Sequence, residues 1–96
     1  MHTKTIEIAK SERGWLVHTT QHWADFPAAH TSKGATTLAQ AIWGPVYHAS
    51  QNDTRIVKLT VNGLPYPRDK AEAAIRKYTT GTLNYTLEAS LAALDI

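Results

Sequence analysis

Residues 5–20 read TIEIAKSERGWLVHTT, and this stretch decides how the chain begins to fold. Its first part, residues 5–10, alternates apolar and polar side chains, which is the period of a strand with one buried face. Residues 11–14 supply turn formers and end in a glycine, which tolerates positive φ. Residues 15–20 are rich in aromatic and β-branched types, as in a returning strand. We therefore predict an antiparallel hairpin over residues 3–20.

A third strand is predicted over residues 55–61, RIVKLTV. Alternation would place Val57 and Leu59 on one face and Lys58 on the other. Asn-Gly at residues 62–63 follows, a pair typical of tight turns with two positive φ angles. The return over residues 64–67 must be brief, because its two prolines cannot donate to a strand ladder.

Three segments have helical signals. Residues 37–40, TLAQ, fit a capping box at a helix start, and Gly-Pro at residues 44–45 must end, kink or restart that helix. Residues 69–72, DKAE, are a second box-like start. Leucines at helical spacing predict a last helix over residues 83–95, although residues 85–87 could instead form a short strand.

The connection over residues 21–34 has no clear period. Pro27 argues against a central strand, so residues 28–32 are either a short edge strand or a loop. Together these elements predict an α+β fold in a single domain, residues 1–96. Its antiparallel sheet would have three to four strands, the N-terminal hairpin plus strand 55–61, with two to three helices packed on one face.

Composition limits the functional classes. The 96 residues carry ten Lys/Arg against eight Asp/Glu, a formal charge of +2, which is weak for a dedicated nucleic-acid binder. No apolar stretch approaches the roughly 18 residues of a membrane span, and no signal peptide precedes the first strand, so we expect a cytoplasmic protein. With no cysteine, disulfides and thiolate metal sites are excluded.

Catalytic and metal-binding patterns are missing from the sequence. His18 and His22 are four residues apart, but in a strand their Cα atoms would be about 13 Å apart, too far to share one ion. No serine sits in a nucleophile elbow, and no glycine run forms a phosphate loop. We therefore expect no metal, no cofactor and no enzymatic activity; a small enzyme or metal-binding protein is the least favoured alternative.

Nucleic-acid binding is the second interpretation. Six basic residues could form one face if strand 55–61 and the second helix lie side by side, and their phosphate contacts would weaken with salt. Glu72 interrupts the helical part of this set, so a solvated helix face is favoured. The six residues are Arg55, Lys58, Arg68, Lys70, Arg76 and Lys77.

Residues 21–30, QHWADFPAAH, are the favoured protein-binding surface. They place Trp23 and Phe26 in an expected loop, with His22 and His30 beside them, and exposed aromatic anchors are typical of binding hot spots. The alternative is that both rings fold back over the sheet and fill the core, because a small domain needs its apolar groups.

Part of the chain resembles HicB-type antitoxins. The resemblance rests on residues 5–8 (TIEI), 14–17 (GWLV) and 25–27 (DFP), then Gly34 and residues 37–41 (TLAQA), and covers about half the chain. It implies a hairpin, an Asp-Phe-Pro turn and a threonine-capped helix in a small regulator that neutralises a protein partner. The chain departs from that pattern in its longer connection at residues 18–24, in its Gly-Pro pair inside the helix, and in lacking an evident DNA-binding tail.

These observations favour a small non-catalytic interaction module that binds another macromolecule, most simply a protein. Inhibitors of a host defence complex, antitoxins and accessory factors encoded by phages or mobile elements are of this kind. A homodimer is a further expectation if the helices cannot bury the last apolar stripe within one chain. That stripe consists of Leu83, Leu87, Leu91 and Leu94.

Overall fold

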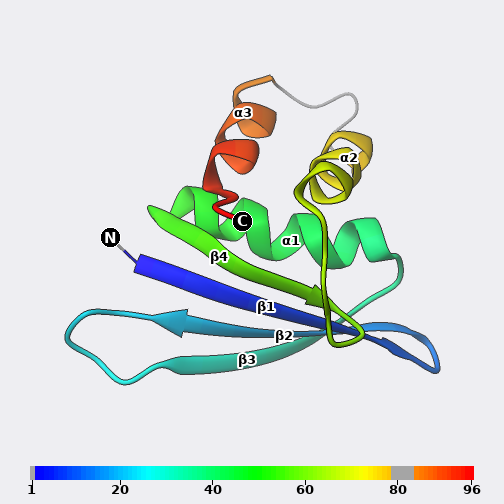
Figure 1. Ribbon diagram of the computed structural model, residues 1–96, viewed down its shortest axis with the longest axis horizontal. Coiled ribbons are helices and arrows are strands. Elements are labelled where there is room, and N and C mark those ends of the chain that lie inside the picture. The colour runs from blue at the N-terminus through cyan, green and yellow to red at the C-terminus, as the bar shows by residue number, and fades with distance from the viewer. Residues whose placement is uncertain (1, 79–83) are drawn as a thin grey trace.

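The computed structural model describes residues 2–78 and 84–96 (Figure 1). Among these residues, no helix is long and apolar enough to cross a membrane. In chain order the elements are β1 (His2–Ser11), β2 (Gly14–His22), β3 (Ala29–Ala35), α1 (Leu38–Gln51), β4 (Thr54–Val61), β5 (Leu64–Pro65), α2 (Arg68–Tyr78) and α3 (Asn84–Ala93).

The described strands form one five-stranded mixed sheet in the order β3-β2-β1-β4-β5. The α+β class is confirmed, but the prediction of three to four antiparallel strands is wrong. β1 pairs antiparallel with β2, whereas β4 lies parallel to β1. The reason is that α1 carries the chain across the sheet before β4 begins, and a helical crossover returns the next strand in the same direction.

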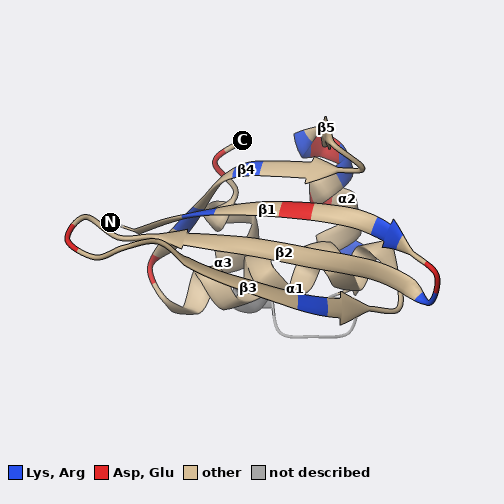
Figure 2. Ribbon diagram, turned by 90° about the horizontal axis from the view of Figure 1, so that it is seen from below, with Lys and Arg blue, Asp and Glu red and all other residues tan. Residues whose placement is uncertain are grey.

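The three helices that the structure describes lie on one side of the sheet, as predicted (Figures 1 and 2). α1 packs on the strands, and α2 and α3 pack on α1. The opposite side of the sheet, which we call the uncovered face, carries no helix of the described residues (Figure 2). The buried apolar residues are Ile6, Ile8, Val17, Ala41, Ile42, Val46, Ala49, Ile56, Leu59, Ala71, Ile75, Ala93 and Leu94.

The predicted hairpin is confirmed, and β2 extends two residues further, to His22. Gly14 has a φ of 145°, and a Cβ there would collide with the backbone oxygen of Ala35 at the end of β3. Of the two alternatives for the following segment, the edge strand is the one formed. β3 begins two residues after Pro27 and pairs only with β2, so the proline stays outside the ladder.

α1 begins as its capping box predicts and continues through Pro45. The Thr37 side chain accepts from the Gln40 backbone N–H at 3.1 Å, while the Gln40 side chain accepts from the N–H of Thr36. Val46 and Ala49, both after the proline, are buried in the core. This packing outweighs the one hydrogen bond that proline removes, because tertiary contacts supply most helical stability.

The predicted alternation of residues 55–61 is wrong. The β1–β4 register pairs Lys4 with Ile56 and Thr5 with Lys58, so Val57 is an extra, bulged residue. Ile56 and Leu59 therefore share the buried face, with 0% and 3% exposure, and Val57 is 41% exposed. A bulge shifts the two-residue period by one, which no alternation rule can anticipate.

The remaining local predictions are largely confirmed. The Asn-Gly turn has φ angles of 53° and 84°. α2 begins at Arg68, so Asp69 lies inside the first turn and is not the cap. Residues 84–93 are helical, which decides against the strand alternative. Of the leucine stripe, Leu87 and Leu91 are partly buried and Leu94 is buried against the core, while Leu83 lies outside the described residues.

Candidate functional site

A hollow of about 390 Å³ lies on the helix side of the sheet, at the end where α1 stops. Further along the same face, Ile6, Ile8 and Val17 pack under α1. Toward the end of α1 the inward-facing strand positions become polar, and His48 and Asn52 at the end of that helix face the same hollow. We call this hollow the polar pocket; its lining is His2, Lys4, Thr19, Gln21, Trp23, Ala29, Thr31, His48, Asn52 and Thr54.

Lys4 is the most unusual residue of the pocket. It lies two residues before Ile6 in β1, so its side chain points to the helix side of the sheet, and it is only 7% exposed. Lysine is almost never this buried unless it is paired. Among residues 2–78 and 84–96, no hydrogen bond or ion pair reaches its amine. Burial lowers the pKa of Lys4, and the charge of nearby Lys33 lowers it further.

The neutral polar groups of the lining are bonded to one another. Gln21 donates from Nε2 to the Thr54 hydroxyl at 3.4 Å, which donates to the Asn52 carbonyl at 3.1 Å. The hydroxyls of Thr19 and Thr31 are bonded to each other across β2 and β3. Asn52, in turn, donates from Nδ2 to the His48 carbonyl at 2.7 Å. This network fixes the wall of the pocket.

His2 adds a second unsatisfied group. Its Nδ1 is buried and has no hydrogen-bond partner in the described structure. Its ring meets the ring of Trp23 edge to face, with centroids 6.5 Å apart. Buried polar atoms are nearly always bonded to protein or water, so the unbonded Nδ1 of His2 is unusual. The amine of Lys4, which no described residue bonds, is the charged donor of this lining that a ligand could use.

The four residues predicted for protein binding all come from the β2–β3 hairpin, but they do not converge. Trp23 is half-buried and lines the polar pocket. It therefore agrees only in part with the alternative in which both rings fold back over the sheet. Phe26 lies in the loop between the strands and is 71% exposed. His22 and His30 are both exposed. Their strand positions place them on the uncovered face, opposite the pocket.

On the uncovered face His30 takes part in a small polar cluster. Its ring stacks on that of His18, with centroids 5.6 Å apart. Nδ1 of His30 lies 3.1 Å from the Thr20 hydroxyl, and Nδ1 of His18 lies 3.0 Å from that of Ser32. These cross-strand pairs tie β2 to β3. Within the described part of the chain, no three His, Asp or Glu side chains gather as a metal site would require.

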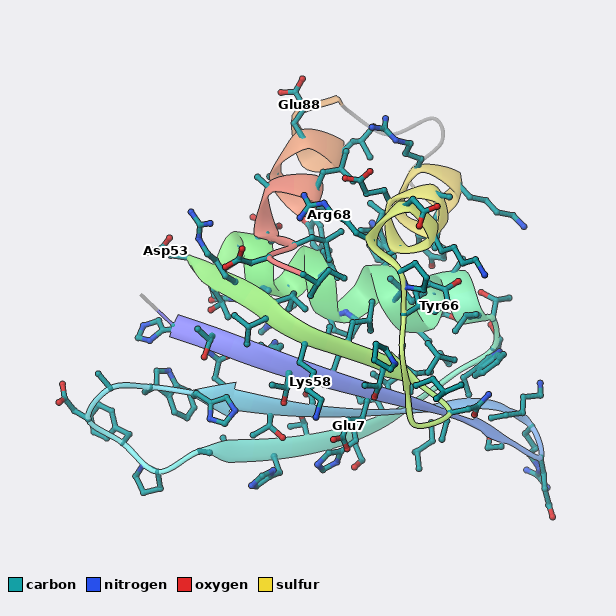
Figure 3. The ribbon with its side chains drawn as sticks, in the orientation of Figure 1. Glu7, Asp53, Lys58, Tyr66, Arg68 and Glu88 are labelled. Carbon is teal, nitrogen blue, oxygen red and sulfur yellow. The ribbon has the colours of Figure 1, made fainter. Side chains whose placement is uncertain are left out.

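The six residues of the predicted basic face lie in two layers. Arg55 and Lys58 belong to β4 and point to the uncovered face, where Lys58 is diagonal to Glu7 of β1 (Figure 3). The other four, Arg68, Lys70, Arg76 and Lys77, lie along α2 in the helical layer.

Arg68 has a structural role within the helical layer. Its guanidinium pairs with Glu72 at 3.2 Å and donates to the Leu94 carbonyl at 2.7 Å, which ties α2 to the end of α3 (Figure 3). Exposed pairs at this helical spacing are worth about 0.3–0.5 kcal/mol, so the bond to the Leu94 carbonyl is the more specific contact.

Sequence reasoning missed the polar pocket. One signal could have indicated it: Lys4 precedes Ile6 and Ile8 at the two-residue spacing of a strand, so the alternation places a lysine on the buried face. His48 has no comparable signal, because it reaches the pocket only through the packing of α1.

No protein-family model, curated protein or solved structure matches this chain. The resemblance to HicB-type antitoxins therefore rests on the quoted residues alone.

Proposed function

We propose that this protein is a non-catalytic module that binds another protein through the β2–β3 loop, with Phe26 as the main anchor. The observation that carries the proposal is the 71% exposure of the Phe26 side chain. The loop that holds it projects past the start of β1 and forms one extreme of the molecule (Figures 1 and 2). A large apolar side chain in such a position gains its burial energy only when a partner covers it.

The base of the loop supports this role. Trp23 packs against His2, so the chain leaving β2 is held, and β3 starts again at Ala29 in register with Gln21. An anchor on a braced loop loses less conformational freedom on binding than one on a loose segment. His22 and His30 flank the loop on the uncovered face and would supply polar contacts around the anchor, as the rims of interfaces do.

The biological role we propose follows from this mode of action. A module that covers a partner's surface can block it, so an inhibitor of a host defence complex, an antitoxin or an accessory factor of a phage or mobile element would work in this way. Phe26 belongs to the segment that resembles an Asp-Phe-Pro turn of HicB-type antitoxins.

The test is affinity capture from a lysate of the native host, comparing Phe26→Ala with the unmodified protein. Loss of a hot-spot aromatic costs about 2 kcal/mol or more, so capture of the specific partner should fall at least about tenfold. Leu64→Ala is the matched control. Leu64 is also 71% exposed, but it lies in β5, at the opposite edge of the sheet from β3. Equal capture by the Phe26 variant and the unmodified protein would remove the loop as the binding surface.

A further inference from the structure

The unsatisfied groups of the polar pocket all favour negative charge. Its ionisable lining residues, Lys4, His2 and His48, are bases. The neutral side chains around them are engaged with one another, as described above. What remains for a ligand is the Lys4 ammonium with its three donors. A ligand must therefore bring acceptors and an anionic charge.

The charge of the ligand is set by Lys4. Burial disfavours the charged form of Lys4, and a single anion brought beside the amine offsets that cost. A monovalent carboxylate matches one ammonium, and charge-assisted hydrogen bonds of this type are among the stronger ones. Lys33 lies in β3, paired with Val17 of β2 on the helix side of the sheet. Its charge acts on Lys4 and adds positive potential to the site.

The size and walls of the pocket set the rest of the ligand. About 390 Å³ lies within the usual range for small-molecule sites and is far more than a bare ion fills. Trp23 and Ala29 are the apolar residues of its lining. We propose that the polar pocket binds a small organic carboxylate, with the carboxylate on Lys4 and an apolar body against Trp23.

This site is independent of the Phe26 anchor, since Phe26 is not part of the pocket lining. The carboxylate has two conceivable sources, a free small molecule or a glutamate side chain of a protein. Both present the same group to Lys4, and the experiment below separates them.

The experiment is an NMR titration of the ¹⁵N-labelled protein with phenylacetate. Phenylacetamide serves as a neutral ligand of nearly the same shape. We expect saturable shifts of the Trp23 indole N–H and of β1 signals around Lys4 with phenylacetate, and at least tenfold weaker binding of the amide. A blocked glutamate dipeptide forms the second arm: tighter binding than phenylacetate would assign the site to a protein side chain, and weaker binding to a free carboxylate.

Variants make the assignment specific. Lys4→Met should weaken phenylacetate binding at least tenfold, whereas Lys58→Met, which removes an exposed lysine of the uncovered face, should leave it unchanged. Lys4→Gln repeats the test with a polar side chain in case the methionine fills the hollow. Equal binding of the amide, retained binding by both Lys4 variants, or no saturable shift at millimolar phenylacetate would each overturn the proposal.

Discussion

Replacing Lys4 by methionine tests how the fold tolerates its buried cation. Lys4 is 7% exposed and no described residue compensates its charge. Burial and the charge of Lys33 lower the pKa of Lys4, so folding disfavours its charged form. Methionine keeps the apolar contacts of the lysine stem and removes the amine. We expect Lys4→Met to be more stable than the unmodified protein at pH 7 by about 1 kcal/mol, which raises Tm by about 4–8 °C in a chain of this size.

The pH dependence of this difference has a definite sign. Burial, and then the charge of Lys33, lowers the pKa of Lys4 in the folded state from its ordinary 10.5. Between the lowered value and 10.5 the unfolded chain binds more protons than the folded one, so the unmodified protein gains stability as pH rises. The advantage of the methionine variant is therefore fully present below the lowered pKa, and its charge-dependent part disappears above 10.5.

Urea unfolding followed by circular dichroism, from pH 7 to pH 11, measures both effects. His2 and His48 line the same pocket and the charge of Lys33 acts on Lys4, but all three are present in both proteins, so the difference isolates Lys4 to first order. Lys58→Met is the control and should change the free energy of unfolding by less than about 0.5 kcal/mol, as exposed substitutions do. A Lys4 variant that is less stable at pH 7, or whose advantage grows with pH, would refute the reasoning by showing that the amine gains a favourable contact on folding.

Two further predictions concern the fold, and both are checked by urea unfolding. Ile56→Ala should cost about 2–5 kcal/mol and Val57→Ala less than about 1 kcal/mol, because the bulge buries the first and exposes the second; the reverse order would place the bulge elsewhere. Gly14→Ala should cost about 2 kcal/mol or more, since its φ of 145° disfavours a side chain and the new Cβ would collide with Ala35. A near-neutral result would mean that the end of β3 can move away.

The local features of the fold were readable from the sequence because each depends on neighbouring residues alone. The Asn-Gly turn needs two positive φ angles, and that pair adopts them easily. Thr37 and Gln40 meet at a helix start because their spacing places them within reach of exposed amides. The hairpin of β1 and β2 needs only an alternating pattern and a turn.

The candidate site was only partly predictable, for a similar reason. The exposed Phe26 follows from its place in a turn next to Pro27, which is a local property. Trp23 looked equivalent in the sequence but lines the polar pocket, because β1 brings His2 beside it. His48 lies 44 positions after Lys4 in the chain, and only the packing of α1 on the sheet joins them in one lining.

The amino-acid sequence by itself determined the turns, the helix starts, the N-terminal hairpin and the α+β class, because short-range sterics and periodicity decide these. Only the tertiary structure decided the parallel position of β4, the bulge at Val57, the continuation of α1 through Pro45 and the pocket around Lys4. Each of these depends on contacts between segments distant in the chain, whose combined burial energy outweighs the local preference that sequence patterns record.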